Sequence, residues 1–310
     1  MNNFKKIGLS ALAGSLVATS AFAGEMSVAG SASLNVEHTN GGAANAGKTF
    51  SMGNQLTFSG SGELDNGLNV ALSFVLDQAD ADPSPFDSHS VTISSDGLGS
   101  LKFSGEGGSS ALTAMDGSAG GDIWDSFDVT GSITPTGLGG GDNSVMYTLP
   151  AMVDGVAINA SYTPTGSAAQ SSTAFNVTYT GVEGLSVSYA QGDGTNSGTD
   201  GTAMKASYAM GSFTVAVSDY EHDTTGTASD DEITSYKLSY TVSDELSVTY
   251  GADTVERPGL IDGEYDGVTV SYTAGGMTIT ATFQEAENMD GTTTATQDRE
   301  RWALGASFAF

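Results

Sequence analysis

The sequence predicts an all-β fold, a sixteen-stranded antiparallel β-barrel of the kind that crosses a membrane. Three observations predict it. Apolar residues recur at every second position in segments along the whole chain, the connections between these segments alternate between long and short, and the residues of the opposite phase are small and polar. A soluble sheet would instead hold its large apolar residues inside, so the pattern favours lipid outside and water inside.

The N-terminus carries the pattern of a cleaved secretory signal. Two lysines precede a short apolar run, and a small-residue site, Ala21-Phe22-Ala23, follows it. A membrane anchor is the alternative, but the run is short and interrupted by glycine and serine. We therefore expect a signal peptide over residues 1–23 and a single barrel domain over residues 24–310.

Composition limits the classes of partner. The chain has 37 acidic residues, nine basic ones, no cysteine and a formal net charge of −28. Without cysteine there is no disulfide framework and no site for lipid attachment. Nucleic acid is excluded as a partner because phosphate contacts need basic patches. Beyond the signal no apolar stretch is long enough for a spanning helix, which excludes a helix bundle.

The period-two segments number sixteen, and an even number is what closed bacterial barrels have. They cover residues 25–38, 50–64, 68–77, 88–94, 100–106, 143–149, 156–162, 173–180, 185–191, 203–210, 213–220, 232–242, 246–254, 265–273, 277–284 and 299–310.

The connections between the segments are sorted by length. Every odd connection is long and every even one is short, and the short ones, such as Asp65-Asn66-Gly67 and Ala274-Gly275-Gly276, carry the residues of tight turns. Strands would then run up and down in order, with the tight turns at one end. Outer-membrane barrels have short periplasmic turns and long outer loops, whereas a soluble sandwich has no reason to sort its loops.

Within each segment the apolar residues stay at every second position, so they share one phase and lie on one face of the strand. Phe213, Val215 and Val217 form one such set, and the residues between them are small or polar. Tyrosines at the ends of these sets, such as Tyr240 and Tyr272, fit an aromatic girdle at the membrane interface. Eight strands would fill their interior with side chains, whereas sixteen leave an aqueous channel.

Three stretches carry a family resemblance. They are "GLGSLKFSGEG" at 97–107, "DNSVMYTLPAMVDGVAINASYTP" at 142–164, and the C-terminal "WALGASFAF". With its strand count and loop order, the chain resembles the sixteen-stranded general porins of Gram-negative bacteria, in particular the alphaproteobacterial ones. The resemblance implies a homotrimer in outer-membrane lipid, passive passage of small hydrophilic solutes, and a terminal Phe310 that the outer-membrane assembly machinery reads as a signal.

The family also implies a long third loop folded into the lumen as a constriction. Connection 107–142 is third among the long connections and far longer than the others, and loops of such length are usually functional. It contains no base, and by the family pattern its carboxylates line one side of the pore. The candidates are Glu106 at its entrance and Asp116, Asp122, Asp125 and Asp128 within it.

Two other interpretations of these carboxylates stay open. They are either merely solvated, or Asp116, Asp122 and Asp125 bind a calcium ion, although their spacing departs from that of an EF-hand. No other cofactor is expected.

Most of the few basic residues beyond the signal are predicted to lie on the polar face of their strands. Only Lys48 and Arg257 are expected in long connections, and the other five fall on the polar phase, as expected when a base against lipid costs about 2–4 kcal/mol. We expect some of them to face the acidic loop across the pore. The predicted second to fourth strands lack the arginines of general porins, which favours cations over anions. The five predicted pore-lining bases are Lys102, Lys205, Lys237, Arg299 and Arg301.

The predicted function is therefore a cation-preferring porin. A substrate-specific channel remains an alternative, as does a non-transporting acidic surface protein or adhesin built on a soluble sheet. An enzyme is not expected, because His38, His89 and His222 are accompanied by no nucleophile elbow and no zinc-ligand spacing.

Overall fold

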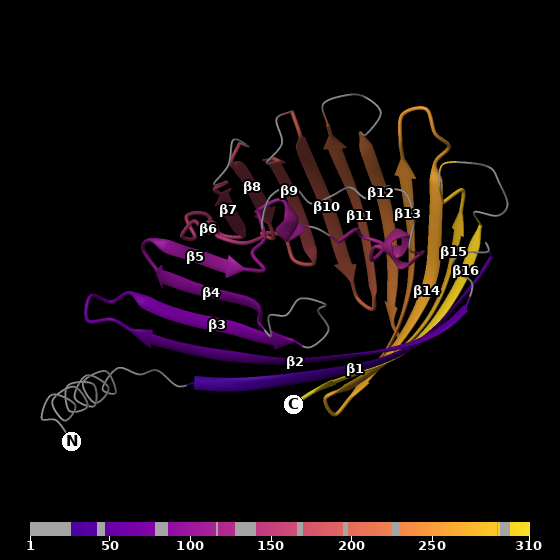
Figure 1. The fold of residues 1–310 in the computed structure, drawn as a ribbon, viewed down its shortest axis with the longest axis horizontal. Coiled ribbons are helices and arrows are strands. Elements are labelled where there is room, and N and C mark those ends of the chain that lie inside the picture. The colour runs from indigo at the N-terminus through magenta and orange to yellow at the C-terminus, as the bar shows by residue number, and fades with distance from the viewer. Residues whose placement is uncertain are drawn as a thin grey trace, which may run out of the picture.

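The computed structural model describes residues 26–41, 47–77, 86–115, 117–127, 141–165, 170–194, 198–224, 230–289, 291 and 298–310, so the expected signal peptide lies outside them. Within these residues the chain forms sixteen strands and two short 3-10 helices (Figure 1). The strands are β1 (Met26–Asn40), β2 (Gly47–Glu63), β3 (Asn69–Asp77), β4 (Phe86–Ser95), β5 (Gly99–Glu106), β6 (Ser144–Thr148), β7 (Val156–Thr163), β8 (Ser172–Tyr179), β9 (Leu185–Asp193), β10 (Asp200–Met210), β11 (Phe213–Asp223), β12 (Asp231–Thr241), β13 (Leu246–Glu256), β14 (Gly263–Ala274), β15 (Met277–Glu287) and β16 (Arg299–Ala309), and the helices are η1 (Thr113–Met115) and η2 (Ile123–Phe127).

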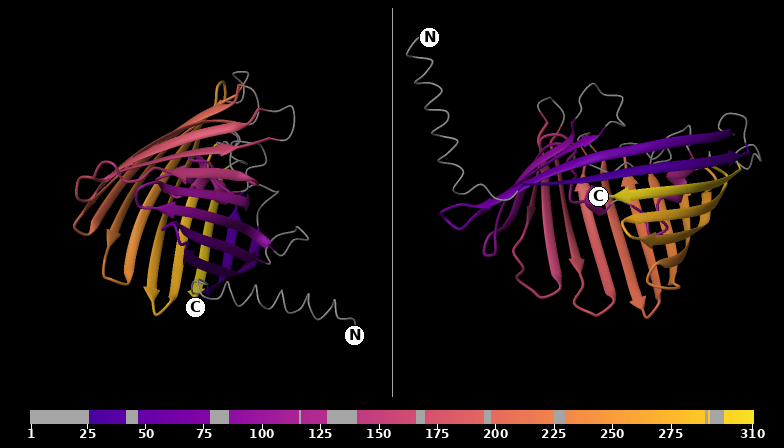
Figure 2. Two further views of the ribbon diagram at one scale, coloured as in Figure 1. Left: turned by 90° about the vertical axis from the view of Figure 1, so that its left-hand side faces the viewer. Right: turned by 90° about the horizontal axis from the view of Figure 1, so that it is seen from below.

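The sheet closes on itself. Each strand pairs antiparallel with its neighbours in the sequence, and β1 also pairs with β16, with Leu34 opposite Ala306. Figure 2 shows β16 (yellow) beside β1 (indigo) at this seam. The terminal residue extends the pairing, because the backbone N–H of Phe310 donates to the Gly30 carbonyl at 3.0 Å. The predicted sixteen-stranded antiparallel barrel is confirmed.

The two faces of the sheet differ as the alternation predicts. On β11, Val215 and Val217 are nearly half exposed, whereas Ser218 of the opposite phase is buried. Large exposed side chains also pair across strands on the apolar face, where the rings of Phe213 and Tyr240 lie 4.8 Å apart. The barrel therefore presents its apolar face outward, as a lipid-facing wall does. No helix in the described residues is long and apolar enough to span a membrane.

The connections keep the predicted order of long and short. The tightest turns join β10 to β11 and β14 to β15, and Gly275 and Gly276 both adopt positive φ, at 59° and 81°. Such angles are accessible to glycine at no steric cost. Except for the third, the long connections are shorter than predicted, because several strands continue past their apolar residues into polar sequence while keeping their backbone pairing.

Lys48 illustrates this extension and corrects one expectation. It was expected in a long connection, but it lies in β2 opposite His38 of β1. It shares the phase of exposed Phe50 and Met52, so it belongs to the outer face. The base therefore lies near the end of its strand and does not face the lumen.

Candidate constriction and channel wall

The third connection lies against the polar face of the barrel. Figure 1 shows η1 and η2, both magenta, within the ring of strands, near β9–β10 and β13. Described residues between 107 and 127 hydrogen-bond to side chains of seven strands, all of the phase opposite to the exposed apolar residues. These wall partners are Ser161, Asn176, Lys205, Ser218, Tyr220, Ser235, Asp253 and Gln284.

The first part of this connection packs on small residues. The Ala111 N–H donates to Ser161 Oγ at 2.8 Å, and Asn176 Nδ2 donates to the Ala111 carbonyl at 2.7 Å. Both backbone groups of this buried alanine are thus satisfied by the wall. The apolar contacts beside them join Ala111, Leu112 and Met115 to the wall alanines Ala174, Ala190 and Ala203.

Asp253 anchors the middle of the connection. Its side chain is 1% exposed and accepts from Ser118 Oγ at 3.0 Å, Ser235 Oγ at 2.5 Å and the Ile123 N–H at 2.7 Å. Gly120 is needed beside it, because a Cβ there would lie 2.5 Å from Asp253 Oδ1. A buried carboxylate with several donors is a strong attachment point, and losing a donor would be costly.

An apolar cluster holds η2. On β12–β15, the inner-face residues near the strand ends that lead into the long connections are apolar instead of small and polar. These residues form the cluster with η2. The sequence reasoning missed these residues, although their departure from the small polar pattern of their phase was a detectable signal. The buried members are Ile123 and Phe127 of η2 with Ile233, Val255, Tyr265, Ala286 and Met289 of the wall region.

Lys205 lies beneath the connection. Its Nζ donates to the Met115 carbonyl at 3.2 Å and lies 5.9 Å from the Tyr220 ring centroid. The Tyr220 hydroxyl donates to the same carbonyl at 2.6 Å. This base has the predicted phase, and its charge is directed at a loop carbonyl.

Arg301 crosses the barrel seam. Its Nη2 forms an ion pair with Glu37 of β1, and its Nη1 donates to Gln284 Oε1 on β15 at 2.6 Å. The Glu37 carboxylate also accepts from Thr49 Oγ1 at 3.0 Å. Arg301 therefore has the predicted phase but is engaged by wall residues.

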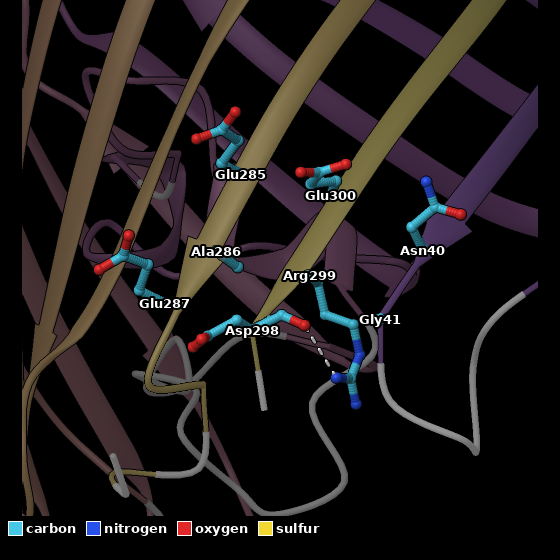
Figure 3. Close-up of a pocket in the computed structure, with 8 residues that line it drawn as sticks. All are labelled: Asn40, Gly41, Glu285, Ala286, Glu287, Asp298, Arg299 and Glu300. Atoms are coloured by element: carbon cyan, nitrogen blue, oxygen red, sulfur yellow. Dashed lines mark hydrogen bonds between the residues drawn. The ribbon is translucent and has the colours of Figure 1, made fainter. Parts of the chain in front are cut away.

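Arg299 lies by the mouth of the barrel, beside a hollow of about 320 Å³ (Figure 3). Its side chain is buried, and Nη1 donates to the Asp298 carbonyl at 3.1 Å. Figure 3 shows it directed away from Glu285 and Glu300, whose carboxylates gather on the neighbouring strand ends. Acidic groups thus outnumber this single base around the hollow.

Lys102 and Lys237 also have the predicted phase. Lys102 is exposed on β5 opposite Thr92, and Lys237 is partly exposed on β12 opposite Gly251. The structure therefore brings the five predicted bases to one face of the barrel but not to one place on it.

Among the predicted loop carboxylates, Asp122 and Asp125 lie in the described residues, and Asp116 and Asp128 lie outside them. Asp122 adopts φ 54° and accepts from the Ser118 N–H at 2.6 Å, so it shapes the loop. Asp125 is exposed. No three metal-ligating side chains come together among the residues described, and the calcium site stays a prediction.

Glu106 has a placement that the alternation did not predict. A register shift interrupts β4–β5 pairing beside His89, which is paired with Glu106. The Glu106 carboxylate lies 3.8 Å from His89 Nδ1, and His89 shares the phase of exposed Val91. A bulge changes the face to which the next side chain points. Glu106 therefore lies on the outer face, away from the loop carboxylates.

Among the described residues, the inner face of β1–β4 carries no lysine or arginine. Ser27, Ser59, Ser73 and Ser90 lie opposite one another in a row across these four strands and line a hollow of about 310 Å³. Hydroxyl groups thus occupy the wall region where the resemblance implies arginines.

The family comparison identifies the chain. Residues 8–257 match the family model described as Gram-negative porin. The chain belongs to the Gram-negative porin family. This porin is thus an outer-membrane channel protein, and its family and fold are those of channels rather than enzymes.

Solved structures share the fold of this porin. A loop-deletion variant of OmpT, an outer membrane protein of Vibrio cholerae, is 16% identical, with a TM-score of 0.69 over 93% of this chain and 99% of the other. A variant of the Rh. blastica porin is 15% identical, with a TM-score of 0.67 over 92% of this chain and 100% of the other. No curated protein is significantly similar in sequence.

Proposed function

We propose that this porin passes small hydrophilic solutes by passive diffusion and prefers cations. The observation that carries the preference is the distribution of charge on the inner face. Arg301 is paired with Glu37, Lys205 is directed at a loop carbonyl, and the β1–β4 wall is lined by hydroxyls. With a formal net charge of −28, the protein enriches cations around the pore.

We propose further that the connection 107–142 narrows the channel. Its described part is held along one side of the lumen by Asp253 and the apolar cluster around η2. We expect the solute path to run between it and the hydroxyl-lined wall of β1–β4, with exposed Asp125 as a carboxylate beside that path. Charged linings of this kind tune ion selectivity.

Reversal potentials test the preference. Purified protein in planar bilayers under a potassium chloride gradient is expected to give a reversal potential of the sign that marks cation selectivity. Screening should weaken the preference as the salt concentration rises. Anion selectivity at low salt would contradict the proposal.

Assembly forms the remaining part of the proposal. We expect cleavage after residue 23, insertion by machinery that reads Phe310, and association as a homotrimer in outer-membrane lipid. The support for Phe310 is its backbone pairing with Gly30, which places it at the closing seam. The N-terminal residue of the exported protein, determined by mass spectrometry, checks the cleavage.

The adhesin interpretation required a soluble sheet. The closed barrel instead exposes rows of large apolar side chains, including Leu238 at 46% and Phe283 at 64%. Exposed apolar rows around a closed sheet are explained by lipid. No observation in the described residues favours a substrate-specific channel over general diffusion.

A further inference from the structure

A continuous chain of polar contacts runs from β2 across the closing seam to the third connection. It starts where Thr49 Oγ1 donates to Glu37 Oε1 at 3.0 Å, and continues through the ion pair of Glu37 with Arg301. Arg301 Nη1 donates to Gln284 Oε1 at 2.6 Å, and Gln284 Nε2 donates to Ser126 Oγ of η2 at 3.4 Å. Four strands and the loop are thereby joined through side chains.

The donor groups of Arg301 fix the orientation of the Gln284 amide in this series of contacts. A guanidinium has only donors, so it must face the oxygen of the Gln284 amide. That contact fixes the amide orientation and leaves Nε2, a donor, directed at Ser126. The seam contact therefore determines which end of the amide meets Ser126, because a reversed amide would place two donors, Arg301 Nη1 and Gln284 Nε2, against each other.

The ion pair is shielded enough to hold this geometry. The Arg301 side chain is 13% exposed and that of Glu37 is 32% exposed. Charge-assisted hydrogen bonds are stronger than neutral ones, and partial burial reduces screening by salt. The partners are 264 residues apart in the sequence and meet only because β1 pairs with β16.

The Ser126 contact holds a part of η2 that the other contacts between loop and wall do not hold. Asp253 holds Ser118 and the start of η2, whereas Ser126 lies near the end of η2, beside buried Phe127. Gln284 thus acts on the C-terminal part of η2.

We propose that Arg301 and Gln284 are positioning residues that couple closure of the barrel seam to the position of the third connection, and so to the steadiness of the open channel. The proposal rests on the proposed channel function. Arg301 then acts through its wall partners Glu37 and Gln284, and not as a free charge in the path of the solute.

Replacing Gln284 tests the coupling without removing a charge. Gln284→Met keeps the length of the side chain and loses both polar contacts. We expect about a two- to tenfold rise in the frequency of transitions to sub-conductance states in single-channel records, the range for losing the one hydrogen bond to the loop, at Ser126. Gln284→Glu should restore the original frequency, because a carboxylate accepts from Arg301 and the Ser126 hydroxyl can donate to it. Gln55→Met is the matched control on β2, where no described loop residue makes a hydrogen bond.

A double-mutant cycle tests whether the contacts act as one chain. Glu37→Gln and Ser126→Ala change residues that do not touch each other, so independent effects on the transition frequency would multiply. We expect the double variant to show a smaller change than that product. In the Gln284→Met background, the two changes should have little further effect.

The outcomes separate this inference from the proposed function. Absence of conductance from the unaltered protein would sink the proposed function. Steady conductance with Gln284→Met behaving like Gln55→Met would overturn the inference alone. Independent effects of Glu37→Gln and Ser126→Ala would likewise overturn it.

Discussion

At the scale of residues, a buried carboxylate carries much of the attachment of the third connection. Asp253→Asn replaces one acceptor oxygen with a donor, which cannot accept the Ile123 N–H or a serine proton. We expect exchange of the Ile123 amide hydrogen to accelerate by about 5- to 100-fold, the effect of an unsatisfied buried group. Hydrogen exchange of the loop peptide, read by mass spectrometry, measures this.

Glu63→Gln supplies the control for Asp253. It removes an exposed carboxylate of the same phase on β2 and should leave exchange in the loop unchanged. Equal protection of the loop in Asp253→Asn and the unaltered protein would show that the apolar cluster alone holds η2.

The sequence predicted the face of the sheet on which each residue lies, but not the residues that it contacts. Alternation placed Asp253, Lys205 and Arg301 on the inner face, because backbone geometry fixes that property. Their contacts depend on the path of the loop and on pairing of the first strand with the last. The small wall residues gave no sign of a docking role, since serine and alanine equally suit a water-filled lumen.

At the scale of elements, each strand has one face for lipid and one for water. Val270→Arg on β14 puts a charge on the exposed apolar face, at a cost of about 2–4 kcal/mol near the midplane. Ser271→Arg puts the same charge one residue further, on the inner face. We expect the first variant to lower the fraction of folded barrel in outer membranes strongly and the second to lower it little.

Mobility in detergent gels measures the folded fraction of these two variants, because a closed barrel that is not boiled runs faster than the unfolded chain. Equal folded fractions for Val270→Arg and Ser271→Arg would contradict the assignment of the outer face of β14.

The number and order of the strands could be predicted from the sequence, but the residues at which the strands begin and end could not. All sixteen strands and the sorted connections were predicted from apolar period and turn residues. Lys48 was misplaced because pairing continues beyond the apolar band, where polar side chains are also accommodated. Glu106 changed face because a local register shift leaves no mark in the alternation.

At the scale of the whole molecule, the proposed channel is an aqueous path bordered by the third connection. The sequence led to the barrel and, by resemblance, to the constriction, but not to the wall that holds it. Asp125, exposed on η2, is the described residue that reports most directly on the path. The chain has no cysteine, so a single introduced cysteine can be modified selectively.

Conductance of Asp125→Cys channels in planar bilayers tests the central claim. A bulky, neutral thiol reagent is expected to lower the single-channel conductance of this variant. It should leave the unaltered protein and Asp96→Cys, in the turn between β4 and β5, unchanged. Complete labelling of Asp125→Cys with no change in conductance would contradict a constriction formed by the third connection.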